Sequence, residues 1–210
     1  MALCSLGAFI LSAFLPSTGP TSPILGQWES AERSAGGRGE IVEFRPDGSF
    51  LQMVAAMGDA TFEVRGDGLL TFWKDNATGK TFVIENRIDF EGDVLLQKDD
   101  QGNLLDSLQR IARGRGSDPP LVGKWCSESL PGVATLREFT RDGKMFIRLL
   151  ITAAHGRFRI SGDTLTTDSD RSPSRTFRFR VENDLLTVIP AGSPEKKFKR
   201  AETTLLQDMP

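Results

Sequence analysis

The chain contains two copies of one segment of about ninety residues. Leu25–Ser30, which reads LGQWES, recurs at Val122–Ser127 as VGKWCS. Further matches follow in the same order: Glu43–Gly48 with Glu138–Gly143, Phe62–Leu69 with Phe158–Leu165, Phe90–Leu95 with Val181–Leu186, and Arg110 with Arg200. Self-similarity in a conserved order along one chain predicts two copies of one folding unit.

The repeat divides the chain into five parts. Residues 1–23 form an apolar N-terminal segment, 24–113 the first domain, 114–120 a linker rich in Gly and Pro, 121–202 the second domain, and 203–210 a C-terminal tail. The apolar run from Leu3 to Leu15 has the length of a secretory signal core and is short for a spanning helix. We therefore expect a secreted or periplasmic protein that meets a membrane only if this segment stays uncleaved.

Each copy has the pattern of short β-strands joined by tight turns. Phe158 and Ile160 alternate with Arg157 and Arg159, as in a strand with one buried face. Asp-Gly and Asn-Asp pairs, which suit hairpin turns, separate such runs. The spacing predicts about eight strands per copy, with Lys144–Ile151 and Gly156–Ser161 as separate strands. The only hint of helical periodicity is at Leu104–Ala112.

A sheet of eight strands with one apolar face would expose two edges, and closure into a barrel removes them. The sequence therefore predicts an all-β protein. We expect two tandem small up-and-down (meander) β-barrels of about eight short strands each, one per copy.

These features together resemble the lipocalin-like (calycin-type) β-barrels, most closely the short bacterial domains of that kind. The shared features are Gly-x-Trp on the first strand, an Asp-Gly hairpin after the second, and an Arg on the last strand. In that family the first-strand Trp packs against the last-strand Arg and closes the barrel end. The resemblance implies that Trp28 pairs with Arg110 (or Arg113), and Trp125 with Arg200, as structural cation–π clamps.

A barrel of this size is either filled by its own side chains or holds one small ligand. Gln52 falls on the inward face of copy one where copy two has Ile147, and a buried polar group needs a partner, so we expect the pocket in copy one. The candidate ligand-binding residues are Phe50, Gln52, Val54, Phe62, Phe82, Ile147, Phe158, Phe177 and Phe179.

The chain lacks the residues that common catalytic and metal-binding sites require. The chain has one histidine, His155, and two cysteines, one of them in the apolar N-terminal run. Its acidic residues follow no calcium-loop spacing, and Gly36–Gly39 lacks the lysine of a phosphate loop. We expect no catalysis, cofactor or metal, and no nucleic-acid binding, because the net charge is −2 and no basic–aromatic motif occurs.

Charge is unevenly divided between the copies. Residues 24–116 carry 11 Lys/Arg and 16 Asp/Glu, and residues 120–202 carry 15 and 10. The copies could attract each other, or the second could face an anionic partner.

Two functions remain open at this stage. The first is an exported, non-catalytic lipocalin-like protein that binds a small apolar or amphiphilic ligand inside a barrel. The alternative is a solid-core interaction module that binds a protein partner, for example in a protease-inhibitor-like or envelope-associated role.

Overall fold

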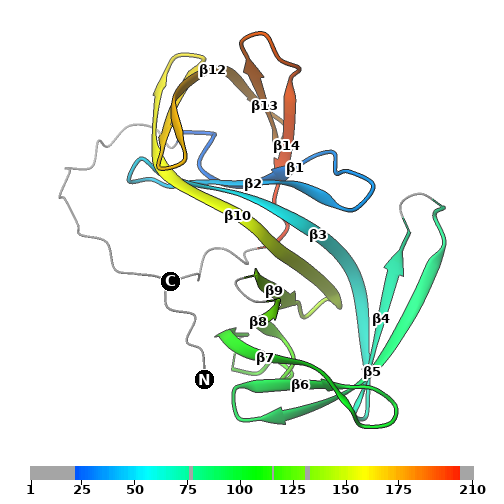
Figure 1. The fold of residues 1–210 in the computed structure, drawn as a ribbon. Coiled ribbons are helices and arrows are strands. Elements are labelled where there is room, and N and C mark those ends of the chain that lie inside the picture. Colours follow the sequence, from blue (N-terminus) through cyan, green and yellow to red (C-terminus); the bar gives the residue numbers. More distant parts are fainter. Residues whose placement is uncertain (1–21, 76–77, 115, 131–132, 204–210) are drawn as a thin grey trace.

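The structure is a computed structural model that describes residues 22–75, 78–114, 116–130 and 133–203. Each strand pairs antiparallel with the next along the chain, and β1 pairs with β14, so the sheet closes (Figure 1). The strands are β1 (Gly26–Ser30), β2 (Arg38–Phe44), β3 (Ser49–Arg65), β4 (Gly68–Lys74), β5 (Thr81–Glu91), β6 (Val94–Lys98), β7 (Leu104–Arg113), β8 (Gly123–Leu130), β9 (Val133–Phe139), β10 (Lys144–Ser161), β11 (Thr164–Ser169), β12 (Ser172–Glu182), β13 (Leu185–Pro190) and β14 (Lys196–Arg200).

The all-β fold class is confirmed, as a fourteen-strand antiparallel meander. The described residues contain no helix, and therefore none that could span a membrane; Leu104–Ala112 lies in β7. The apolar N-terminal segment on which the export prediction rests lies outside the described residues. Turn chemistry is as expected: Gly48 and Gly143 have φ of 79° and 77°, and Asn183 and Asp184 adopt φ of 49° and 60° between β12 and β13.

Two long strands cross the middle of the closed sheet. β3 and β10 pair with each other over thirteen positions, from Ser49 opposite Arg157 to Thr61 opposite Lys144. This pairing divides the sheet into two closed circuits of eight strand segments. Lobe 1 contains β1, β2, residues 49–56 of β3, residues 150–161 of β10, and β11 to β14. Lobe 2 contains residues 56–65 of β3, β4 to β9, and residues 144–149 of β10 (Figure 1).

The hairpin expected between Lys144–Ile151 and Gly156–Ser161 is absent, because both segments belong to the continuous strand β10. The intervening Thr152–His155 contains no Gly, Pro, Asn or Asp, so it offers no residue suited to a tight reversal. A β-bulge between Leu150 and Thr152 accommodates Ile151 instead.

As a consequence, each lobe takes strands from both copies of the repeat. Lobe 1 takes β1, β2 and the start of β3 from copy one, and the end of β10 with β11 to β14 from copy two. The 114–120 segment does not separate two closed units, since it joins β7 to β8, which pair with each other in lobe 2. This differs from the expected arrangement, in which each copy closes on itself.

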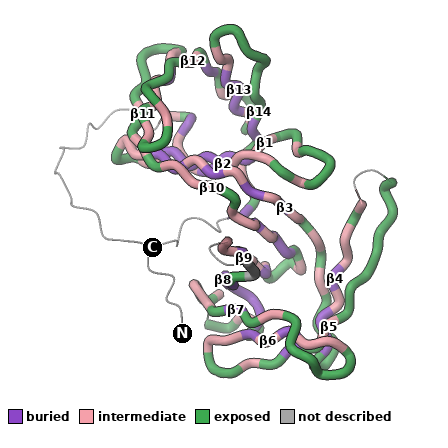
Figure 2. Tube along the Cα trace, viewed as in Figure 1, coloured by how far each residue is buried: buried purple, intermediate pink, exposed green. Residues whose placement is uncertain are grey.

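The apolar core has three parts, and both copies contribute to each. One cluster fills lobe 1 around Trp28 and Phe50, and another fills lobe 2 around Trp125 and Leu108. The third, with Met53 at its centre, packs strands β2, β3, β9 and β10 together where the lobes join. Figure 2 shows buried stretches of β2 and β3 along this junction. The lobes are therefore packed against each other as well as joined by two strands.

The cation–π clamps form with their partners exchanged. The guanidinium of Arg200 lies 4.0 Å from the ring centroid of Trp28, and that of Arg110 lies 3.9 Å from the ring of Trp125. The predicted pairs Trp28–Arg110 and Trp125–Arg200 are thus wrong, because β1 pairs with β14 and β7 with β8. Arg113 pairs with Asp93 through its guanidinium and makes no such contact with a Trp ring.

The glycine of the first clamp makes room for the arginine. Gly26 has φ of 103°, and a Cβ at this position would lie 2.8 Å from Nη1 of Arg200. Trp28 Nε1 donates to the carbonyl oxygen of Ile24 at 2.7 Å, and the indole is fully buried. The Gly-x-Trp motif therefore brings a buried ring and a close guanidinium together at the end of each lobe.

We expect the two clamps to affect different lobes. Arg200→Ala should lower the melting temperature and increase amide exchange in β1 and β14, whereas Arg110→Ala should do so in β7 and β8. Each loses a cation–π contact worth about 0.5–2 kcal/mol. Hydrogen exchange followed by mass spectrometry resolves the strands, and exchange that followed the repeat (β1 with β7, β8 with β14) would contradict the observed pairing.

Candidate functional site

Lobe 1 contains a cavity of about 310 Å³. Its walls come from β2 and β3 of copy one and from β11 to β14 of copy two, so the strand exchange builds it. The apolar lining consists of Val42, Phe44, Phe50, Leu165, Phe177, Leu186, Val188, Pro190 and Phe198.

The lining of this cavity also includes polar and charged side chains. Gln52 Nε2 donates to Glu40 Oε2 at 3.0 Å, and Lys196 Nζ donates to the other carboxylate oxygen. Arg175 is exposed and has no ion pair among the described residues. Thr167, Ser169, Ser172 and Ser193 add hydroxyl groups. Apolar walls with a few polar groups are typical of a site for a small amphiphilic molecule.

The structure distributes the predicted ligand-binding residues over both lobes. Phe50, Gln52 and Phe177 line the lobe 1 cavity, and Phe158 and Phe179 pack in the core around it. Val54 is half-buried on β3 and does not line the cavity.

The remaining three predicted residues belong to lobe 2. Phe62 and Ile147 pack against the lobe 2 core, and Phe82 is 50% exposed. The expectation of a pocket within copy one is therefore wrong in part. Gln52 does line a cavity, but copy two supplies most of the opposing wall. Phe82 is exposed because β6 covers β5 only from Arg87 onward.

Lobe 2 has bulkier side chains at equivalent positions. The repeat aligns Ser169 of lobe 1 with Trp73 of lobe 2, and Gln52 with Ile147. Trp73 packs against the lobe 2 core, so close to Gly58 that a Cβ there would lie 2.7 Å from the indole ring. These substitutions fill the space that remains open in lobe 1.

An arginine also enters lobe 2 where lobe 1 is apolar. Arg137, which aligns with Val42, donates to Gln97 Oε1 and to Asp106 Oδ2, both at 2.6 Å. Burial lowers the pKa of Arg137, and the carboxylate of Asp106 counteracts this. Lobe 2 thus has Trp73, Ile147 and a polar network around Arg137 at positions that line the cavity in lobe 1.

Three charged residues of the cavity lining were not in the predicted site. Glu40 and Lys196 belong to β2 and β14, and Arg175 belongs to β12. Alignment of the two copies could have identified one of these residues. Arg175 aligns with Ile84, so a charged side chain stands where the other copy has an apolar one. No feature of the sequence predicts the exchange of strands that brings Glu40 and Lys196 together.

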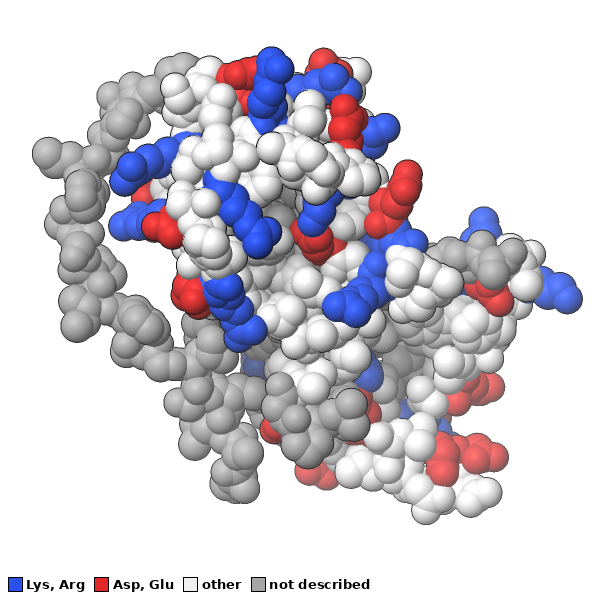
Figure 3. Space-filling view, turned by 45° about the horizontal axis from the view of Figure 1, so that its top comes forward, with Lys and Arg blue, Asp and Glu red and all other residues white. Residues whose placement is uncertain are grey.

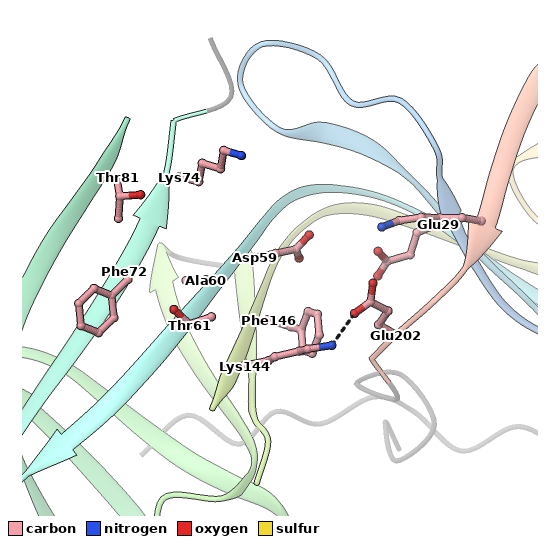
Figure 4. Close-up of a pocket in the computed structure, with 11 residues that line it drawn as sticks. Glu29, Asp59, Ala60, Thr61, Phe72, Lys74, Thr81, Lys144, Phe146 and Glu202 are labelled. Atoms are coloured by element: carbon pink, nitrogen blue, oxygen red, sulfur yellow. Dashed lines mark hydrogen bonds and ion pairs between the residues drawn. The ribbon is translucent and has the colours of Figure 1, made fainter. Parts of the chain in front are cut away.

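A second cavity, of about 340 Å³, lies where the lobes join (Figure 4). Its lining is strongly charged and includes Glu29, Asp59, Lys74 and Lys144. Lys144 Nζ contacts Glu202 at 3.0 Å. The two carboxylates nearest the crossing, Glu29 and Asp59, are already paired with arginines.

These arginines form an ionic network that is buried at Arg148 and Glu29 and reaches the surface at Asp59, whose side chain is 39% exposed. Arg148, whose side chain is 1% exposed, donates to Glu29 Oε1 at 2.7 Å and to Asp59 Oδ1 at 2.8 Å. Arg33 contacts the same two carboxylates at 3.1 and 2.7 Å. Burial of Asp59 would raise its pKa, but Arg148 and Arg33 outweigh this and hold the pKa below its usual value. The network balances two positive with two negative charges and joins β1, β3 and β10.

The uneven charge of the copies is largely evened out between the lobes, since residues 24–56 and 150–202 together carry 13 Lys/Arg and 12 Asp/Glu, and residues 57–149 carry 13 and 15. On the face shown in Figure 3, Lys and Arg side chains are most frequent over the upper lobe, and Asp and Glu gather toward the lower right. Lobe 1 contains β12, which brings Arg175, Arg178 and Arg180 to this lobe. The lobe that contains the cavity therefore has basic side chains of β12 on part of its exterior.

The described residues contain no group of three or more His, Cys, Asp and Glu side chains placed to hold a metal. His155 is exposed, and its backbone N–H donates to Asp170 Oδ1 at 3.0 Å. Comparisons with protein-family models, curated proteins and solved structures found no significant match. The lobe 1 cavity is therefore interpreted from its own residues.

Proposed function

We propose that this protein is an exported, non-catalytic binding protein whose lobe 1 takes a small amphiphilic ligand. In this proposal each lobe is a small lipocalin-like barrel, and the two barrels have exchanged strands through β3 and β10. The ligand's apolar part lies against Phe50, Phe177 and Phe198, and its polar end faces Gln52 and Arg175.

The observation that carries the proposal is the difference between equivalent positions. Ser169 leaves space in lobe 1 where Trp73 fills lobe 2. Gln52 likewise gives lobe 1 a polar group where Ile147 packs in lobe 2. Two lobes built from the same repeat differ at positions where a ligand would be held, and this supports ligand binding as a property of lobe 1.

We expect Ser169→Trp to weaken binding, because it gives lobe 1 the side chain that occupies the equivalent position in lobe 2. The measurement is titration of an environment-sensitive fluorescent amphiphile, with displacement by unlabelled amphiphiles. The dissociation constant should rise at least about tenfold, which is the effect of losing a few apolar contacts. This increase in the dissociation constant is expected whether or not the melting temperature of the variant changes.

The matched control is Asp168→Trp, which places the same side chain on the next residue of β11, where Asp168 is exposed. This variant should bind the probe as the native chain does. Equal binding by Ser169→Trp would exclude lobe 1 as the site, and no saturable binding by the native chain would exclude the proposed function.

The alternative, a solid module that contacts a protein, is favoured by one observation in lobe 2. Trp73 and Ile147 pack against its core, yet β5 exposes Phe82, Val83 and Ile84 to solvent. Adjacent exposed apolar side chains are typical of a contact surface.

A further inference from the structure

Strand β5 has an open edge in lobe 2. β6 pairs with β5 only from Arg87 to Glu91, whereas β4 pairs with it from Thr81 to Arg87. Residues 81–86 therefore have a neighbouring strand on one side only. An unpaired edge of this kind presents backbone N–H and C=O groups that can pair with another strand.

The side chains along this edge are unusually apolar. Phe82, Val83 and Ile84 are 50%, 52% and 42% exposed. Because side chains alternate between the two faces of a strand, Phe82 and Ile84 lie on one face and Val83 on the other. The edge therefore exposes apolar surface on both faces of the sheet.

The other copy has an edge of similar length with different chemistry. Alignment of Phe90 with Val181 places Pro173, Ser174 and Arg175 at the positions of the three apolar residues. β13 pairs with β12 only from Phe177, so this edge is open as well. Proline and charged side chains are means by which sheets avoid edge pairing, and the β5 edge has neither between residues 81 and 84.

The backbone N–H and C=O groups of β5 also point in directions that suit pairing at this edge. Ile88 donates its N–H to the carbonyl oxygen of Asp67, on the side of β4, at 2.7 Å. Alternation along the strand then directs the N–H and C=O groups of Thr81, Val83 and Glu85 away from β4. These three residues form the free ladder of the edge.

We propose that the β5 edge pairs with the same edge of a second copy of this chain, antiparallel and centred on Val83. In this register the two Val83 residues exchange hydrogen bonds, and Thr81 exchanges them with Glu85 of the partner. Phe82 lies opposite Ile84 of the partner on one face. Every outward N–H of the three residues in each copy then has an acceptor.

The segment itself argues for a second copy as the occupant. About Val83 the sequence is self-complementary: apolar residues oppose apolar residues, and Lys80 lies opposite Asn86 rather than a second cation. One short edge buries less than the ~1,200 Å² of a standard stable interface, so the dimer is expected to be reversible.

The experiment is sedimentation velocity on the full chain across a concentration series from roughly 5 to 500 µM. The native chain should shift from monomer to dimer. Val83→Pro should remain monomeric, because proline removes the central outward N–H without removing a bond to β4. Ile84→Arg, which introduces the residue of the other copy, should also remain monomeric.

The matched control is Ser174→Pro, the equivalent position on the β12 edge. Ser174 lies where the register between β11 and β12 shifts and directly follows Pro173, so this edge is already irregular and already contains a proline. This variant should dimerise as the native chain does. A native chain that stays monomeric throughout would overturn the proposal and leave a strand of another protein as the occupant, and dimerisation by both β5 variants would overturn it as well.

Discussion

Cutting the chain between Gly116 and Ser117 should leave its two halves associated in one folded particle. A protease site inserted at this point opens the loop between β7 and β8. Three strand pairs still hold the halves together, namely β1–β14, β3–β10 and β7–β8. All three apolar clusters also contain residues of both copies. Neither half can bury its apolar residues alone.

Size-exclusion chromatography of the cut protein should show one peak at the native volume, containing both fragments. The melting temperature should fall by about 5–10 °C and become dependent on concentration, because unfolding now separates two chains. The fragments should part only in denaturant. Separate peaks of folded fragments in the absence of denaturant would mean that each copy closes on itself.

The sequence contains enough to predict the strands but not their closure. Alternation in Phe158–Ile160 and turn residues such as Asp142-Gly143 depend on neighbours in the sequence, and both predictions agree with β10 and the turn before it. Whether β3 and β10 fold back or continue depends on contacts far apart in the sequence. A continuous strand and a hairpin present the same inward and outward side chains, so the alternation cannot distinguish them.

Only part of the candidate site was predicted, because the strand exchange depends on contacts far apart in the sequence. Phe50, Gln52 and Phe177 were identified by their inward positions, which the strand exchange leaves unchanged. The prediction that these residues share a pocket formed by one copy was wrong, because the strand exchange combines the first part of β3 with β11 to β14. Arg110 and Arg200 changed partners through the same exchange, while the chemistry of each clamp stayed as expected.

Removal of Arg148 should be the most damaging single change at the crossing of β3 and β10. Its side chain is 1% exposed and that of Glu29 is 2% exposed, so Arg148→Ala leaves a buried carboxylate without its main partner. Loss of one member of a buried ion pair costs about 3–5 kcal/mol. Urea denaturation should show this decrease in the free energy of unfolding. The control is Arg178→Ala, which breaks the exposed pair with Asp163 and should leave the free energy of unfolding close to that of the native chain.

The repeat suggests how this loss can be reversed. Arg148 aligns with Met53, and Glu29 aligns with Cys126. Met53 is buried in the apolar cluster at the junction, and Cys126 packs against that cluster. The two sides of the crossing therefore differ at equivalent positions, one having an ion pair and the other apolar contacts.

We therefore expect Glu29→Cys combined with Arg148→Met to recover most of the stability that Arg148→Ala loses, to within about 1–2 kcal/mol of the native chain. An apolar replacement of both partners removes the desolvation cost of two buried charges together with their attraction. Asp59 keeps Arg33 as its partner in this variant. If the double variant were no more stable than Arg148→Ala, the network would hold the two strands together in a way that apolar packing cannot replace.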